Sequence, residues 1–406
     1  MALVVQKYGG TSVATLDKIA NVAKKVIKTK EEGNEVVVVL SAMAGETDRL
    51  IQLAQKAADD PLGSEYDALL STGEQVTVTL LSIVLNGLGH RAKSLLGFQV
   101  RILTDNAFTK ARILSVDTAA MRTELDKGNI VVVAGFQGVD HNNNITTLGR
   151  GGSDTSAVAL AAALKAIRCD IYTDVDGVYT TDPNICGKAR RLNRITYDEM
   201  LEMARAGAKV LHPRSVELAK KYNVPVYVKS SFTDEGGTLV TKEEQGMEKE
   251  AVSGVTYDRD QAKITVVHVP DRPGVAARLF TPLSENNILV DMIIQNASIQ
   301  GHTDLTFTVS RKDIREAKRI ISDAITEVGA EKVEVDDNVA KVSIIGVGMI
   351  SHSGVAAKMF AVLAKEGINI MMISTSEIKI SCVVEAKYAE LAVTVLHDAF
   401  HLEREM

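Results

Sequence analysis

The sequence predicts an α/β protein with a layered domain around a mainly parallel sheet, followed by two ferredoxin-like units. Strand-like and helix-like segments alternate over residues 1–245, which is typical of a layered α/β domain. Later residues repeat one another, and the 406-residue chain is too long for one compact core. We therefore expect domains at 1–245, 262–338 and 339–406, with the charged stretch 241–250 as a linker.

The first domain is expected to place its ligands where its strands end. The segment 36–40 is continuously apolar, as a strand of a parallel sheet that is buried on both faces should be. Polar or glycine-rich turns follow the expected strands, at the edge where open α/β sheets hold ligands. The expected strands are 3–7, 36–40, 130–136, 171–173 and 224–228, and the expected helices are 16–30, 76–88, 157–167 and 200–206.

The last third of the chain contains an internal duplication. Three blocks recur in the same order, and each copy has the β-α-β-β-α-β pattern of a ferredoxin-like unit. The paired blocks are 262–267 with 340–345, 273–280 with 353–360, and 286–290 with 366–370.

Composition excludes several classes of protein. Apolar content of 46% and charged content of 24% indicate a globular chain, and a net charge of -6 without tryptophan argues against nucleic-acid binding. Three widely spaced cysteines favour a reducing cytoplasm over a disulfide framework or a zinc site. The first residues lack an export signal, and no apolar run reaches the roughly 18 residues of a membrane span. We expect a cytoplasmic protein.

The segment 147–156 carries the strongest local signal. It lies between an expected strand and an expected helix, and a helix start offers unpaired N–H groups to an anion. Its glycines allow close approach, its arginine offers a planar fork, and its serine and aspartate are able to cap the helix. A glycine turn with a capped helix is the alternative. The residues are Gly149, Arg150, Gly151, Gly152, Ser153 and Asp154.

Five other motifs join this segment. Lys7 precedes two glycines at the first strand end, which suits a phosphate, although neither a Walker A motif nor a dinucleotide fingerprint is present. Glu74 falls in the expected first turn of a helix, where it is either a ligand group or a partner of the helix dipole. The remaining segments are 41–48, 173–183 and 207–214, the last with a second lysine, Lys209.

Taken in order, these motifs resemble the aspartate kinases of the amino-acid kinase superfamily, and the two repeats resemble ACT domains. The resemblance implies a three-layer αβα kinase domain that transfers the γ-phosphoryl group of ATP to the side-chain carboxylate of L-aspartate. This is the first step of lysine, threonine and methionine biosynthesis. The acceptor is already ionised at neutral pH, so no general base is needed, and the motifs contain a single histidine, His212. A monofunctional enzyme is expected.

The resemblance also assigns roles. Lys7 and Lys209 contact phosphates, the Gly9 and Gly10 amides hold the transferred group, and Asp154 orders the lysines and Mg-ATP. Arg150 binds the substrate α-carboxylate and Glu74 its α-ammonium. Supporting contacts come from Ser41, Thr47, Gly151 and Ser153, and the nucleotide pocket is lined by Tyr8, Thr173, Asp174, Tyr179 and Asp182. Mg²⁺ arrives with ATP, and no separate metal site is expected.

The ACT units imply feedback inhibition by lysine, threonine or both. The expected effector contacts are Asp271, Gly274, Ala276, Asp291 and Gln295 in the first unit and Ser351, Gly354, Asn369 and Thr375 in the second. ACT pairing implies a homo-oligomer, or a heterotetramer if Met247 starts a separate regulatory subunit, although an ordinary linker methionine is equally compatible. The alternative functions are another amino-acid kinase, acting on glutamate or acetylglutamate, and a catalytically silent amino-acid sensor.

Overall fold

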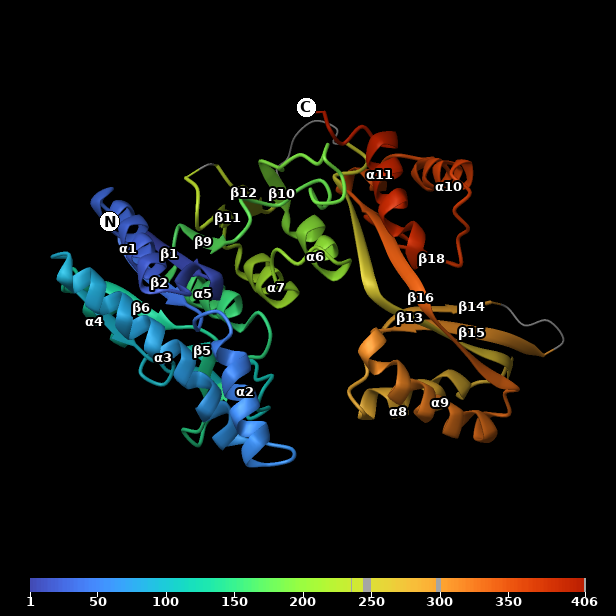
Figure 1. Ribbon diagram of the computed structural model, residues 1–406, viewed down its shortest axis with the longest axis horizontal. Coiled ribbons are helices and arrows are strands. Elements are labelled where there is room, and N and C mark those ends of the chain that lie inside the picture. Colours follow the sequence, from blue (N-terminus) through green and yellow to red (C-terminus); the bar gives the residue numbers. More distant parts are fainter. Residues whose placement is uncertain (235, 244–249, 297–300, 405–406) are drawn as a thin grey trace. The chain divides into compact units, whose positions relative to one another are not determined.

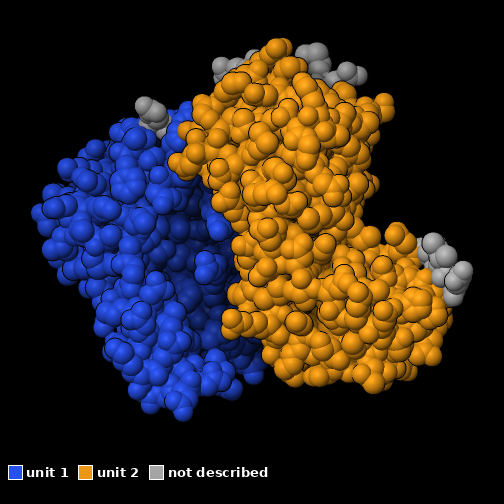
Figure 2. All heavy atoms as spheres, turned by 45° about the vertical axis from the view of Figure 1, so that its right-hand side comes forward, with its two compact units in different colours: residues 1–178, 191–204, 209–246 blue, residues 179–190, 205–208, 247–406 orange. Residues whose placement is uncertain are grey.

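The computed structural model describes residues 1–234, 236–243, 250–296 and 301–404, which form two compact units. Unit 1 comprises residues 1–178, 191–204 and 209–246, and unit 2 comprises 179–190, 205–208 and 247–406 (Figure 2). Two short segments that precede the expected linker thus belong to unit 2. Met247 and most of that linker lie outside the described residues.

Unit 1 is a three-layer α/β domain built on an eight-stranded sheet, which confirms the predicted fold class (Figure 1). Every neighbouring pair is parallel except β11 and β12. The strand order is β10-β12-β11-β9-β1-β2-β6-β3. The strands are β1 (Leu3–Tyr8), β2 (Glu35–Leu40), β3 (Ala92–Leu95), β6 (Ile130–Ala134), β9 (Arg168–Thr173), β10 (Arg194–Thr196), β11 (Val226–Ser230) and β12 (Thr238–Thr241).

Helices cover both faces of this sheet. On one face, α1 and α3 pack on β1, β2 and β6, and the amphipathic α1 begins after Thr15, whose hydroxyl accepts from the Lys18 N–H. On the other face α5 packs against β1, β2, β9 and α7. The helices of unit 1 are α1 (Leu16–Glu31), α2 (Glu46–Ala57), α3 (Ser64–Gly87), α4 (Ala119–Asp126), α5 (Gly152–Leu164), α6 (Tyr197–Arg205) and α7 (Pro213–Tyr222), with the short 3₁₀ helix η1 (Gly10–Val13).

A small second sheet of four strands was not predicted from the sequence. It has the order β5-β4-β7-β8, and the β7–β8 hairpin leads directly into the turn that carries Arg150. Its strands are only three or four residues long, too short for a periodic signal. They are β4 (Ile102–Thr104), β5 (Ile113–Val116), β7 (Gln137–Val139) and β8 (Ile145–Thr147).

Two predicted helix starts are wrong. Helix α3 begins at Ser64 rather than at residue 76, so Glu74 lies in its middle and not in its first turn. Helix α5 begins at Gly152 and its N-cap is Gly151 in the left-handed conformation, so Ser153 and Asp154 sit inside the first turn instead of capping it. In both cases the first helical residues include polar side chains that face a cavity, and such a composition is typical of a turn.

Unit 2 contains the two ferredoxin-like folds, joined in one six-stranded antiparallel sheet of order β14-β15-β13-β16-β18-β17. Each half has its own apolar core beneath a pair of helices. The elements are β13 (Gly254–Pro270), α8 (Val275–Glu285), β14 (Val290–Gln295), β15 (His302–Val309), η2 (Arg311–Asp313), α9 (Ile314–Val328), β16 (Lys332–Ile345), η3 (Val347–Ile350), α10 (Val355–Lys365), β17 (Met372–Thr375), β18 (Lys379–Glu385), η4 (Ala386–Tyr388) and α11 (Ala389–Ala399).

The second repeat is completed differently from the expected β-α-β-β-α-β order. Up to residue 404, the end of the described chain, no strand follows α11. The start of β13 fills that place, because residues 254–258 pair with 341–345 of β16. The second ferredoxin-like fold is therefore discontinuous in sequence, and β13 and β16 each serve both halves.

One helix of the described chain, α3, is long and apolar enough to cross a membrane by length and composition alone. Half of its most apolar stretch is buried in the protein. Its Asp67, Ser71 and Glu74 are buried as well. A core helix of this kind passes the same test, so the observation is weak evidence for a membrane.

Candidate active site

A cavity of about 380 Å³ opens where β1 and β2 end and α5 begins. Most of the lining residues that the sequence predicted come from two segments, the end of β1 and the turn that leads into α5. The cavity brings together twelve residues that were singled out from the sequence: Lys7, Gly9, Gly10, Ser41, Thr47, Glu74, Gly149, Arg150, Gly151, Gly152, Ser153 and Asp154.

An ion pair joins the two elements that meet in the cavity. Lys7 Nζ lies 2.5 Å from Asp154 Oδ1, and both side chains are about nine-tenths buried. Asp154 also lies in the first turn of α5, where the helix dipole favours a negative charge. A cation is thereby held beside Gly9 and Gly10. The predicted use of the Gly9 amide is wrong in this structure, because the Gly9 N–H donates to the Tyr172 carbonyl at 3.2 Å. The Lys7 ammonium and the Gly10 N–H suit the site to phosphate oxygens.

Glu74 is a buried acid with an incomplete set of partners. Its side chain is 3% exposed, and Oε1 accepts the Ala42 N–H at 2.9 Å, whereas Oε2 has no hydrogen-bond partner in the described part of the chain. Burial raises the pKa of Glu74 to about 8, and the Ala42 N–H offsets only part of that rise. A cationic ligand group beside Oε2 would supply the missing interaction.

The absence of a side chain at Gly73 allows this approach. A Cβ atom there would lie 2.8 Å from the Ala42 Cβ. Helix α3 therefore packs directly on the chain that leaves β2, and Glu74, the next residue, reaches the Ala42 N–H.

Arg150 sits on a tightly constrained turn with its side chain exposed. Within the described residues, the structure records no hydrogen bond or ion pair for its guanidinium. The following Gly151 has a φ of 69° and abuts the His212 ring, so a side chain at Gly151 has no room.

His212 supports the cavity rather than acting as a base. Its Nδ1 accepts the Arg214 N–H at 3.4 Å and caps α7. Burial lowers its pKa, so the ring is neutral at pH 7.

The predicted nucleotide residues are more dispersed. The side chain of Tyr8 is fully buried and stacks on Tyr172 with 4.5 Å between ring centroids, so it is not available to a ligand, and the Tyr8 carbonyl accepts the Ser41 N–H at 3.2 Å. Thr173 ends β9 and Asp174 follows it, and Lys209 is exposed in the turn between α6 and α7; none of the three lines the cavity. Tyr179 and Asp182 belong to unit 2.

A second cavity, of about 370 Å³, lies in the first ferredoxin-like half of unit 2. Four predicted effector residues line it: Asp271, Gly274, Ala276 and Gln295. Asp291 does not, and instead forms an ion pair with the buried Lys341.

The effector residues predicted in the second ferredoxin-like half do not line the second cavity, and none of their contacts tests an effector role. Gly354 is the N-cap of α10, and the Ser351 hydroxyl donates to the Gly348 carbonyl at 3.2 Å. Asn369 and Thr375 are exposed.

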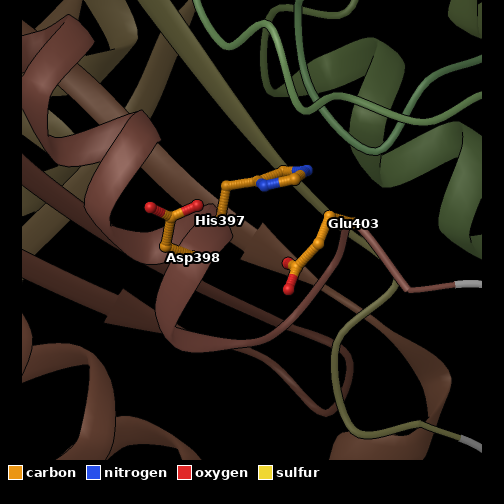
Figure 3. A group of neighbouring side chains, drawn as sticks. All are labelled: His397, Asp398 and Glu403. Atoms are coloured by element: carbon orange, nitrogen blue, oxygen red, sulfur yellow. The ribbon is translucent and has the colours of Figure 1, made fainter.

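A separate group of potential metal ligands lies at the end of α11 (Figure 3). His397, Asp398 and Glu403 offer atoms that lie within 4.8 Å of one another. Lys188 Nζ already lies 2.9 Å from both oxygens of Asp398, and His397 Nε2 bonds the Thr180 hydroxyl at 2.9 Å. We assign this group to holding the segment 179–190 and not to metal binding.

Sequence reasoning missed several cavity residues, notably Met43, Asp48 and Phe136. Asp48 was inside a recognised segment but was given no role. Phe136 has a φ of 66°, a conformation rare for a residue with a bulky side chain, and ordinary strand periodicity does not reveal it.

Comparisons with known proteins agree with this geometry. The model of the amino acid kinase family matches residues 2–230, and an ACT-domain model matches 264–325 and 342–400. The aspartate kinase of Pseudomonas fluorescens is 58% identical over 406 residues, which cover 99% of this chain and 98% of the relative.

Two crystal structures of E. coli aspartokinase III match the whole chain, each covering 98% of it and 99% of their own length. The complex with aspartate and ADP, in the R-state, has a TM-score of 0.81 and 29% identity. The complex with lysine and aspartate, in the T-state, has a TM-score of 0.77 and 30% identity. The chain belongs to the amino acid kinase family and, within it, to the aspartate kinases.

Proposed function

We propose that this protein transfers the γ-phosphoryl group of ATP to the side-chain carboxylate of L-aspartate. The observation that carries the proposal is one cavity containing the Lys7–Asp154 pair, the unpartnered oxygen of Glu74 and the free guanidinium of Arg150. A phosphate and a zwitterionic amino acid need this combination of charges.

Catalysis rests on position and charge. The attacking carboxylate is ionised at neutral pH, so the P–O bond to aspartate forms while the bond to ADP breaks, without a proton to remove. Lys7 and the Gly10 amide stabilise charge on the transferred group. Mg²⁺ enters as part of the substrate Mg-ATP, and Asp154 keeps Lys7 in place beside the phosphates. Lys209, which does not line the cavity, remains a proposed phosphate contact.

The amino acid is selected by two charges. Arg150 binds the α-carboxylate through its planar fork, and Glu74 binds the α-ammonium through Oε2. An N-acylated amino acid would leave Glu74 buried without a cation, so it is rejected. The E. coli enzyme crystallised with aspartate and ADP supports this substrate pair.

Regulation is assigned to unit 2. We infer that lysine, threonine or both bind at the cavity near Asp271 and Gln295 and inhibit the enzyme, which accords with the lysine complex of the E. coli relative. Asp291, Ser351, Gly354, Asn369 and Thr375 remain proposed contacts. We further propose a cytoplasmic oligomer, paired through its ACT units, that begins the pathway to lysine, threonine and methionine.

The test is ADP release by the purified full-length chain with Mg-ATP and single amino acids. L-aspartate should support turnover, whereas glutamate and N-acetylglutamate should not. Lysine and threonine are then added separately and together. Release of ADP that does not depend on aspartate would reject the proposal, and turnover with glutamate would replace the substrate.

A further inference from the structure

Asp67 is a completely buried carboxylate that takes no direct part in the cavity. It lies in the first turn of α3 and is 0% exposed. Its oxygens accept the Thr109 N–H at 3.0 Å, the Thr147 N–H at 2.6 Å and the Thr147 hydroxyl at 2.9 Å. In the described part of the chain the structure records no cation beside it.

The two bonds from Thr147 end on the chain that leads to Arg150. Thr147 is the last residue of β8, three positions before Arg150, and Thr109 precedes the strand β5 of the same small sheet. From another side, Arg214 of α7 donates to the Leu148 carbonyl at 2.6 Å and to the Ala111 carbonyl at 2.9 Å. The backbone before Arg150 is thus fixed by one anion and one cation from two different helices.

Stability alone is a poor explanation for this arrangement. Burial raises the pKa of Asp67 above its ordinary value, and the Thr109 and Thr147 groups offset only part of that rise, so a carboxylate in this buried place costs stability. A carboxylate with three donors does, however, fix direction and register, because each donor must point at it. The free guanidinium of Arg150 depends on that register, since no side chain of the described residues bonds it.

We infer that Asp67 is a positioning residue for aspartate recognition: through Thr147 it sets the turn from which Arg150 reaches the substrate α-carboxylate, and Arg214 holds the same turn from the other side. The inference rests on the proposed role of Arg150. It goes further by placing part of the substrate specificity on a residue that never touches the substrate.

The test compares aspartate with β-alanine in Asp67→Asn, Arg150→Ala and the double variant. β-Alanine keeps the ammonium and the side-chain carboxylate of aspartate but lacks the α-carboxylate. Asp67→Asn should raise the KM for aspartate by roughly tenfold or more, with a smaller effect on kcat and on the KM for ATP. The inhibition constant of β-alanine should stay within about twofold of wild type. In the Arg150→Ala background, Asp67→Asn should add little.

Matched controls separate positioning from general damage. Asp140→Asn changes another buried carboxylate, which accepts the Asn142 and Asn144 N–H groups at the far end of the β7–β8 hairpin. This control should leave the ratio of the KM for aspartate to the inhibition constant of β-alanine unchanged. If Asp67→Asn fails to fold in thermal melts, Arg214→Lys takes its place, with Arg122→Lys as its control. Arg122 bonds the Leu164 carbonyl at the opposite end of α5.

The outcomes distinguish this inference from the proposed function. Equal weakening of aspartate and β-alanine, or additive effects of Asp67→Asn and Arg150→Ala, would overturn the positioning role alone. Unchanged aspartate binding in Arg150→Ala would overturn the role proposed for Arg150 and this inference with it. A raised ratio of the KM for aspartate to the inhibition constant of β-alanine in Asp67→Asn or Arg214→Lys, but in neither control, supports the inference.

Discussion

Two acids of the same cavity, Glu74 and Asp154, have different partners. Asp154 forms an ion pair with the Lys7 ammonium. Glu74 has a single N–H partner and a buried free oxygen, and burial raises its pKa to about 8. Without a ligand, Glu74 is therefore mostly protonated at pH 7, and a bound ammonium group should ionise it.

This difference predicts proton release when aspartate binds. At pH 7 we expect most of one proton to leave per aspartate, measured by calorimetry in buffers of different ionisation enthalpy, because a carboxyl group with a pKa of about 8 is mostly protonated there. Glu74→Gln should release almost none and should bind aspartate more weakly, with ATP binding kept. Equal release by the two proteins would rule out Glu74 as the source.

The same pKa predicts how stability changes with pH. The folded protein holds a proton on Glu74 that the unfolded chain, with its ordinary pKa near 4.5, gives up first. Its contribution therefore stabilises the fold at low pH and is lost as pH rises from about 4.5 to 8. Thermal melts should show a steeper fall across this window for wild type than for Glu74→Gln; parallel curves would contradict the assignment.

The Lys7–Asp154 pair should control turnover and not folding. Lys7→Ala and Asp154→Ala remove charge stabilisation of the transferred group, so kcat should fall about 100-fold or more. Circular dichroism should remain unchanged. Lys25→Ala is the control, because Lys25 of α1 forms an ion pair of the same 2.5 Å length with Asp234, whose side chain is 76% exposed. Near wild-type turnover in either cavity variant would contradict the mechanism.

At the scale of elements, helix α3 marks what sequence patterns could and could not predict. Five of the eight strands of the main sheet and α1 were predicted, because continuous apolar runs and helical spacing are local signals. The short strands β3, β10 and β12 were not predicted. The first twelve residues of α3 were missed because Ser71, Gly73 and Glu74 serve the cavity and resemble a turn. The motifs identified most of the cavity residues. No sequence pattern predicted a role for Asp67, because its hydrogen-bond partners lie 42 and 80 positions away.

At Gly73 we therefore predict that alanine destabilises the helix, opposite to its intrinsic helix propensity. Alanine normally stabilises a helix by about 1 kcal/mol relative to glycine. At Gly73 the added Cβ would lie 2.8 Å from Ala42, so α3 must shift and Glu74 must leave the Ala42 N–H. Gly73→Ala should raise the KM for aspartate and lower the melting temperature. Gly87→Ala, at the end of the same helix with nothing within 4 Å, should leave both unharmed; equal behaviour of the two variants would refute the packing argument.

At the scale of the whole molecule, the chain order does not follow the structural units. Segment 179–190 comes shortly after Thr173 and Asp174, yet it belongs to unit 2. Its Thr180 carbonyl accepts the Val255 N–H at 2.7 Å and its hydroxyl bonds His397 at 2.9 Å. No local pattern predicts such a connection. It means that residues proposed for the nucleotide, Tyr179 and Asp182, are held by the unit that is proposed to bind the effector.

This connection predicts the kinetic form of inhibition. An effector acts only through different affinities for two states of the enzyme. Because Tyr179 and Asp182, which are proposed to bind the nucleotide, belong to unit 2, the effect should appear mainly in the KM for ATP. The double variant Asp271→Ala, Gln295→Ala removes two residues of the effector cavity and should require at least about tenfold more lysine or threonine for half-inhibition. Asp323→Ala, which removes an exposed partner of Arg319 on α9, is the control. Inhibition unchanged in the double variant would exclude this cavity as the effector site, and inhibition expressed only in the KM for aspartate would exclude the route through segment 179–190.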